Sequence, residues 1–233
     1  MFNLIFIILT LIILSFLHVK KTHLKYVTIL TFIFLMYFNL DLEVSTDLIK
    51  QIGILTTSLL IIYLAIKESE NEEYLLIVLA MIGLYTLAES TNLFTLFLAL
   101  ELQSFIGYTL VRNHTISGNE SSLKYFLVGT IASALFILGS CLIYGQTGLL
   151  DYITIFEFQE YNNILINLGT ILLLIALIFK IGASPFHIWL PDVYAGASYE
   201  TLLFISIFPK IFLFILLKNL TQFLEMSSIL VIA

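Results

Sequence analysis

The sequence has few residues of the kinds that build redox, metal or nucleotide sites. It contains one cysteine, Cys141, among 233 residues, which excludes an internal disulfide, a CxxC pair and a thiolate cage for zinc or an iron–sulfur cluster. No GxGxxG, GxxxxGKS/T or HExxH pattern occurs, so nucleotide binding and metal-dependent hydrolysis have no support. We therefore expect no cofactor and no metal site in this chain.

Charged residues are also scarce, at 11% of the chain, whereas 60% of the side chains are hydrophobic and the mean hydropathy is +1.06. Soluble domains carry about 25% charged residues, so the composition indicates a membrane protein. The net charge of −6 and the lack of a basic groove argue against nucleic acid as a partner. Because one crossing needs about 20 apolar residues, this length allows at most roughly eight to nine crossings and no soluble domain.

The hydrophobic pattern predicts an all-α, polytopic membrane helix bundle. Apolar runs between charged or turn-forming clusters predict helices at about 2–17, 24–40, 48–66, 74–88, 92–112, 121–145, 161–196 and 199–218. From Gln222 the chain turns apolar again, which is typical of the start of a ninth helix.

The predicted seventh helix, 161–196, is too long for one crossing, because about 36 residues of continuous helix span about 54 Å. Gly182, Ser184 and Pro185 occur together within it. Pro185 removes a hydrogen bond to the carbonyl of Ile181, and its ring clashes with that turn. We therefore expect a broken helix, and in transporters such breaks mark a transport path.

Three charged residues, Glu101, Lys180 and Lys210, lie deep within apolar segments. Insertion scales give each central charge a cost of about 2.5–3.5 kcal/mol, which has to be offset. We expect Glu101 to pair with one lysine, and the other lysine to be neutral or hydrated because desolvation disfavours its charged form. Such a lysine can exchange a proton. In the alternative interpretation, the charged pair only joins two helices.

One proline predicts an irregular backbone beside Lys210, and two further residues, His187 and Lys124, are candidates for proton transfer. Pro209 directly precedes Lys210 and frees the carbonyl of Ile205, which predicts a second irregular position beside a buried cation. His187, two residues after the break, can relay protons, or it is a neutral side chain bonded to freed carbonyls. Lys124, near the start of the sixth helix, either takes part in proton transfer or extends to the membrane interface.

Four stretches carry a specific resemblance to a known family. They are LFLALELQSFIGYTLV from Leu96, SSLKYFLVGTIASALFILG from Ser121, FKIGASPFHIWLPDVYAGA from Phe179 and IFPKI from Ile207. In order and spacing, over roughly residues 90–215, they resemble NADH dehydrogenase subunit 2, one of the antiporter-like membrane subunits of respiratory complex I. The first 70 residues match that family only in hydropathy.

The resemblance implies three leading transmembrane helices over 1–70, one antiporter-like five-helix repeat over 71–218 and the start of a ninth helix over 219–233. It also implies that Glu101 and Lys180 form a functional pair and that Lys210 continues a hydrated axis. Many relatives read GAPTPV where this chain reads GASYET, which adds the carboxylate of Glu200.

In function, the resemblance implies a proton-translocating membrane-arm subunit of NADH:ubiquinone oxidoreductase that performs no redox step itself. Flavin, iron–sulfur clusters and quinone are expected in partner subunits. The expected partners are other membrane-arm subunits, lipids and a separate chain supplying a second repeat. The expected location is the mitochondrial inner membrane, with the bacterial plasma membrane as the alternative. Two other functions stay open: a subunit of a multi-subunit cation/proton antiporter, and a scaffold without a proton path.

Overall fold

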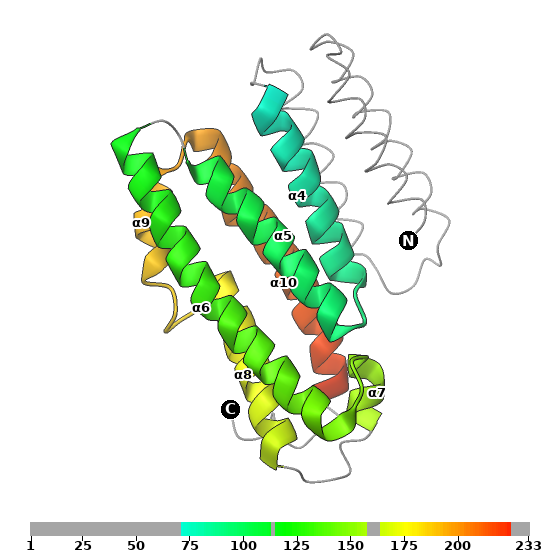
Figure 1. The fold of residues 1–233 in the computed structure, drawn as a ribbon. Helices are drawn as coiled ribbons and strands as arrows, with labels where there is room; N and C mark the ends of the chain where they lie inside the picture. Colours follow the sequence, from blue (N-terminus) through cyan, green and yellow to red (C-terminus); the bar gives the residue numbers. More distant parts are fainter. Residues whose placement is uncertain (1–70, 113–114, 158–163, 225–233) are drawn as a thin grey trace, which may run out of the picture. The chain divides into compact units, whose positions relative to one another are not determined.

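The structure is a computed structural model that describes residues 71–112, 115–157 and 164–224. These residues form α-helices and, apart from an isolated bridge between Asn92 and Asp151, no β-structure (Figure 1). The helices are α4 (Asn71–Glu89), α5 (Leu93–Val111), α6 (Ile116–Thr147), α7 (Tyr152–Glu157), α8 (Ile164–Ile181), α9 (Trp189–Gly196) and α10 (Tyr199–Leu224). The helices predicted at 2–17, 24–40 and 48–66 lie outside the described residues.

The chain divides into two units between Met81 and Ile82, within α4. Of the first unit, the structure describes Asn71–Met81, which form the first part of α4. The second unit begins at Ile82 and contains all the later helices. The domain boundaries at 70 and 218 stay predictions.

Four of the described helices are long and apolar enough to cross a membrane, which confirms the predicted polytopic helix class. These segments are Leu93–Val111, Ile116–Thr147, Ile164–Ile181 and Tyr199–Leu217. The ends of α6 differ from the predicted 121–145 because local caps set them. Thr115 accepts a hydrogen bond from the amide of Gly118 at the first turn, and Gly148 ends the helix with a φ of 68°. Likewise, α10 runs to Leu224 rather than to residue 218.

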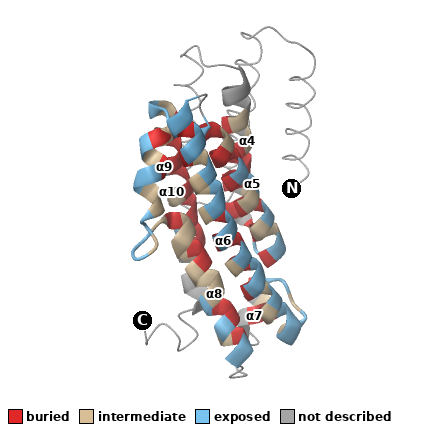
Figure 2. Cartoon of the chain, turned by 60° about the vertical axis from the view of Figure 1, so that its left-hand side comes forward, coloured by how far each residue is buried: buried red, intermediate tan, exposed pale blue. Residues whose placement is uncertain are grey.

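Helix α6 packs against α5, α8 and α9, and α10 packs against α5 and α8. The contact between α6 and α8 brings two backbones together, since a Cβ on Gly139 would lie 2.7 Å from the carbonyl oxygen of Gly169. Small residues allow this kind of close approach between membrane helices. The opposite face of α6 exposes apolar side chains such as Leu127 and Ile131 (Figure 2). A face of this kind suits contact with lipid.

The loop that starts at Leu149 contains the short helix α7. The backbone amide of Tyr152 donates to the carbonyl of Thr91 at 3.1 Å, and its buried hydroxyl donates to the carbonyl of Ser90 at 2.8 Å. Burial raises the pKa of Tyr152, and the neighbouring Asp151 carboxylate raises it further. These bonds join the α4–α5 connection to the α6–α7 connection.

The predicted break in the seventh segment is confirmed, since α8 ends at Ile181 and α9 begins at Trp189. The residue that ends α8 is Gly182, with a φ of 72°, rather than Pro185. The amide of Gly182 donates to the carbonyl of Phe179 at 3.1 Å, and the amide of Ala183 donates to that of Ile178 at 3.2 Å. This is the Schellman pattern, which favours glycine at its left-handed position. Pro185 therefore lies inside the break and does not start it.

Candidate functional site

The last turn of α8 places Lys180 against α5, where it forms the predicted ion pair with Glu101. The Nζ atom of Lys180 lies 3.1 Å from Oε1 of Glu101, and it also donates to the Ser104 hydroxyl at 2.9 Å and to the Leu100 carbonyl at 3.4 Å. The Lys180 side chain is 8% exposed and that of Glu101 is 37% exposed. Of the two lysines that the sequence offered as partners of Glu101, the structure therefore selects Lys180.

Two serines that sequence reasoning missed complete the surroundings of this pair. Ser104 is buried on α5 and, besides accepting from Lys180, donates to the Leu100 carbonyl at 2.7 Å. Ser133, on α6, donates to Oε1 of Glu101 and to the Gly129 carbonyl. Ser104 was detectable, because residues three apart on a helix share a face. Ser133 had no such signal, because it comes from another helix.

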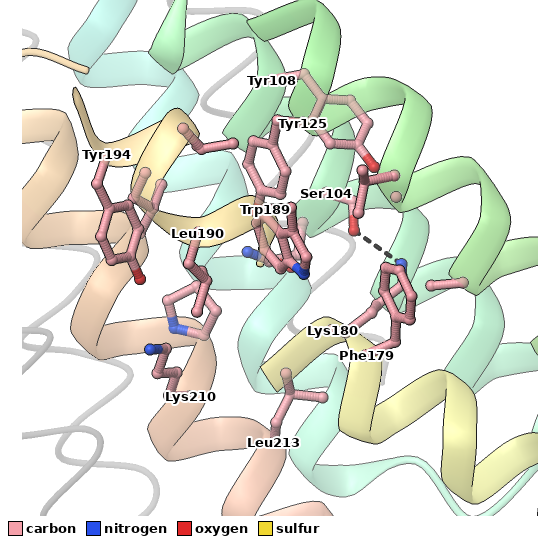
Figure 3. Close-up of a pocket in the computed structure, with 17 residues that line it drawn as sticks. Ser104, Tyr108, Tyr125, Phe179, Lys180, Trp189, Leu190, Tyr194, Lys210 and Leu213 are labelled. Carbon is pink, nitrogen blue, oxygen red and sulfur yellow. Dashed lines mark hydrogen bonds between the residues drawn. The ribbon is translucent and has the colours of Figure 1, made fainter. Parts of the chain in front are cut away.

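A cavity of about 30 Å³ extends from Lys180 to Lys210. Its lining comes from α5, α6, α8, α9 and α10, and this volume is enough for about two water molecules. Figure 3 shows the two lysines on opposite sides of the view, with the side chains of Trp189 and Leu190 between them. The predicted pair and the second predicted lysine therefore belong to one site.

Three polar side-chain atoms around this cavity are buried without a hydrogen-bond partner among the described residues. They are Nε2 of Gln103, Nε1 of Trp189 and the hydroxyl of Tyr194, and all three residues line the cavity. A buried polar atom without a partner costs about 1–3 kcal/mol, and native structures usually satisfy it with protein or ordered water. The cavity is therefore both large enough and polar enough to hold water.

Lys210 lies on α10 at the far side of this cavity. Its Nζ atom is 5.8 Å from the ring centroid of Tyr194, in the range of a cation–π contact. No carboxylate of the residues that the structure describes forms an ion pair with Lys210. Pro209 beside it also lines the cavity, but α10 continues through this proline as one helix. The predicted irregularity is therefore limited to the missing amide donor of Pro209.

The structure places Lys124 and His187 outside the cavity lining. Lys124 forms ion pairs with Glu120 at 2.8 Å and with Asp192 at 3.0 Å, and its side chain is 43% exposed. His187 is exposed within the break between α8 and α9. Their roles in proton transfer stay predictions.

The site combines a partly buried ion pair between membrane helices, a helix broken beside it and a polar cavity that leads to a second lysine. These features are typical of membrane proteins that move protons or cations. The sequence model of the family described as "NADH:quinone oxidoreductase/Mrp antiporter, TM" matches residues 90–232, more than half of the chain. The chain belongs to this family.

Curated relatives agree with the resemblance predicted from the motifs. The chain is 38% identical over 158 residues to NADH-quinone oxidoreductase subunit N of Ruthia magnifica, covering 64% of this chain and 33% of the relative. It is 35% identical over 161 residues to NADH-ubiquinone oxidoreductase chain 2 of Rhizopus oryzae, and this match covers 67% of this chain and 31% of the relative. The chain thus spans about a third of the length of these relatives. The predicted similarity to subunit 2 is confirmed.

Solved structures show the same fold. A chain of respiratory complex I from Thermus thermophilus with bound aureothin matches with a TM-score of 0.79 and 27% identity, covering 98% of this chain and 56% of that one. A chain of the membrane-bound sulfane sulfur reductase, an archaeal respiratory membrane complex, matches with a TM-score of 0.75. This match has 18% sequence identity and covers 97% of this chain and 52% of the other, so it supports the fold alone.

Proposed function

We propose that this chain is a proton-translocating membrane-arm subunit of an NADH:quinone oxidoreductase. The observation that carries the proposal is the polar cavity that joins the Glu101–Lys180 pair to Lys210. Its unpartnered Gln103, Trp189 and Tyr194 atoms support water in this space, and water between two lysines is the medium that proton transfer needs. Family membership supports the same function.

The site suggests how a proton is released. The ammonium of Lys180 is buried, so its charged form depends on Glu101 and on the oxygens of Ser104 and Leu100. If the Glu101 carboxylate moves away or is neutralised, the buried cation loses the interaction that offsets its desolvation. Lys180 then transfers a proton from Nζ to water in the cavity. Lys210, which pairs with no described carboxylate, lines the same cavity and is the next side chain positioned to receive that proton.

In this proposal the energy comes from partner subunits. Oxidation of NADH and reduction of quinone, with flavin and iron–sulfur clusters, take place in those subunits, and this chain carries out no redox step. Other membrane-arm subunits are its neighbours, which is supported by its likeness to a chain of respiratory complex I. A separate chain that supplies a second repeat stays a prediction, and mass spectrometry of the purified complex tests it.

The membrane is that of a bacterium or the inner membrane of a mitochondrion. Relatives named as subunit N come from bacteria, such as Coxiella burnetii at 40% identity over 152 residues, and chain 2 comes from Rhizopus oryzae. The mitochondrial location therefore stays a prediction, which similarity to the Rhizopus oryzae chain 2 supports.

The variants Glu101→Gln and Lys210→Met, made in the assembled complex, test the proposal. We expect normal assembly and reduced proton pumping, because each variant removes one charge from the path and keeps the side-chain volume. NADH-driven acidification of proteoliposomes, measured beside NADH oxidation, separates pumping from catalysis. Full activity with an undiminished proton ratio in both variants contradicts a pump and favours a scaffold.

The cation/proton antiporter alternative stays open because the family description includes Mrp antiporters. A chain of the Mrp complex from Dietzia matches with a TM-score of 0.67 at 19% identity, which supports the shared fold only. Purification of the native complex decides between them. Co-purification with flavin and iron–sulfur proteins supports the oxidoreductase, and a complex without them supports the antiporter.

A further inference from the structure

Helix α9, which follows the break, packs tightly along the first turns of α6. A Cβ on Gly196 would lie 2.7 Å from the carbonyl oxygen of Ser117 and would also overlap the side chain of Ser121. At the other end of α9, the Trp189 ring stacks on Tyr125 with centroids 5.3 Å apart and planes at 15°. Contacts at positions 189 and 196 lie on one helix face, since they are two turns apart.

Asp192, between these two contacts, is bonded to α6 through both its backbone and its side chain. Its carbonyl oxygen accepts from the Ser121 hydroxyl at 2.8 Å, and its carboxylate pairs with Nζ of Lys124 at 3.0 Å. Lys124 also pairs with Glu120 at 2.8 Å, within α6. Lys124 therefore carries the one ion pair between α6 and α9 in the part of the chain that the structure describes.

The same short helix forms one wall of the cavity between Lys180 and Lys210. Trp189, Leu190 and Tyr194 all line this space, and two of the unpartnered polar atoms belong to them (Figure 3). Non-helical residues flank α9 on both sides, at 182–188 and at 197–198. A helix of eight residues between two such connections has little local stability of its own, so its position depends on its contacts.

We propose that Lys124 is a positioning residue, whose ion pair with Asp192 holds α9 on α6 and keeps the Trp189 and Tyr194 wall of the cavity in place. In this role Lys124 acts through its charge and its reach, and it stays protonated throughout. The role differs from the proton-transfer role that the sequence suggested. Its consequence for pumping rests on the proposed function, whereas its effect on α9 does not.

Arginine separates the two roles. A guanidinium keeps the charge and the donors needed to bind Asp192, but it does not give up a proton in proteins. Lys124→Arg therefore preserves a positioning contact and abolishes a proton carrier. Lys124→Met removes the charge at similar length, so it disrupts either role.

Trp189 reports directly on the position of α9, because it is the only tryptophan of the chain. In the full chain reconstituted in lipid nanodiscs, we would measure the emission of Trp189 and its quenching by acrylamide. Asp192→Asn breaks the same ion pair from the other side. The matched control is Glu120→Gln, which removes the partner of Lys124 within α6 and leaves the pair with Asp192.

We expect Lys124→Met and Asp192→Asn to shift Trp189 emission to the red and to raise acrylamide quenching, because the loss of one exposed ion pair raises the equilibrium constant for displacement of α9 by up to about five-fold. Lys124→Arg and Glu120→Gln should match the wild type. Unchanged quenching in Lys124→Met, or quenching in Lys124→Arg as high as in Lys124→Met, overturns the proposal.

If a single variant does not fold, as judged by circular dichroism, the exchange of charges in Lys124→Asp with Asp192→Lys decides the matter. If the double variant restores quenching toward the wild type, the positioning role of Lys124 is supported. If it does not, that role is overturned.

In the assembled complex, Lys124→Met should lower proton pumping, and Lys124→Arg should keep it at the wild-type level. Loss of pumping in Lys124→Arg with normal Trp189 quenching instead assigns Lys124 to the proton path. A complex that pumps normally with both Glu101→Gln and Lys210→Met refutes the proposed function and leaves the fluorescence result standing.

Discussion

Two cavities lined by described residues of the second unit have about the same volume, about 30 Å³ each, but opposite linings. The polar cavity joins Lys180 to Lys210 and is surrounded by three buried polar atoms that find no partner among the described residues. The apolar cavity lies where α5 begins and α6 ends, and its wall presents apolar atoms only. It is lined by Leu93, Ile143, Tyr152, Ile155, Thr170, Leu173, Leu174, Leu177 and Leu220. Volume alone therefore does not distinguish a proton path from a packing defect.

The difference lies in where the polar groups of the lining find their partners. In the apolar cavity, the Tyr152 hydroxyl donates to the Ser90 carbonyl and the Thr170 hydroxyl donates to the Asn167 carbonyl, each at 2.8 Å. Both groups are satisfied without water. In the polar cavity, Trp189 and Tyr194 have buried polar atoms that find no partner among the described residues, and water in the cavity can satisfy them. Because apolar cavities stay dry and polar ones hold water, we expect one hydrated space and one dry space of equal size.

The largest effect is expected where the polar cavity meets the ion pair. Lys180→Met leaves Glu101 without its counter-charge, and because the Glu101 side chain is 37% exposed, the cost should fall below that of breaking a fully buried pair, which is about 3–5 kcal/mol. We expect a lower melting temperature of the full chain in detergent and a loss of NADH-driven pumping in the assembled complex. The double variant Glu101→Gln with Lys180→Met removes both charges.

That double variant separates stability from function. It should recover most of the lost melting temperature, because no charge is left unpaired, but it should not recover pumping. A double variant that pumps like the wild type shows that the pair joins α5 to α8 and does nothing more. This outcome would contradict the proposed role of Lys180 in proton transfer.

Intermediate effects are expected from single hydroxyls in the polar cavity. If water bonds the Tyr194 hydroxyl, Tyr194→Phe loses that bond and costs about 0.5–1.5 kcal/mol, whereas a truly unsatisfied hydroxyl gives a gain of about 1–3 kcal/mol. We expect the loss, with a several-fold slower rate of pumping. Tyr199→Phe is the matched control, because Tyr199 is 72% exposed. A more stable Tyr194→Phe chain shows that the cavity is dry.

Much of the fold was predictable because helices in a membrane follow hydropathy closely. The bounds of α5 lie within a residue of the predicted 92–112, and the break in 161–196 was expected from its length and from Gly182, Ser184 and Pro185. The ends of α6 were not predicted, since the Thr115 cap and the Gly148 terminus lie in polar sequence outside the hydrophobic window.

The site was predictable only where charge marks it. Glu101, Lys180 and Lys210 are conspicuous in apolar segments, and the pairing of Glu101 with a lysine follows from the cost of burial. Ser133 and Trp189 were not found, because they are uncharged and gain their role from tertiary contacts that the sequence does not show. The ion pair between Lys124 and Asp192 was missed because 68 residues separate the two partners, so only the tertiary fold brings them together.

The smallest effect is expected in the apolar cavity. Thr170→Val removes one hydroxyl and keeps the shape of the side chain, and that hydroxyl bonds a carbonyl of its own helix rather than water. The change should alter stability by less than about 0.5 kcal/mol and leave pumping unchanged. Thermal unfolding of the full chain and pumping by the complex, each measured beside Tyr194→Phe, compare the loss of one hydroxyl at the two cavities. If Thr170→Val slows pumping as Tyr194→Phe does, the second cavity is also hydrated, and the partners of the polar groups do not decide where protons move.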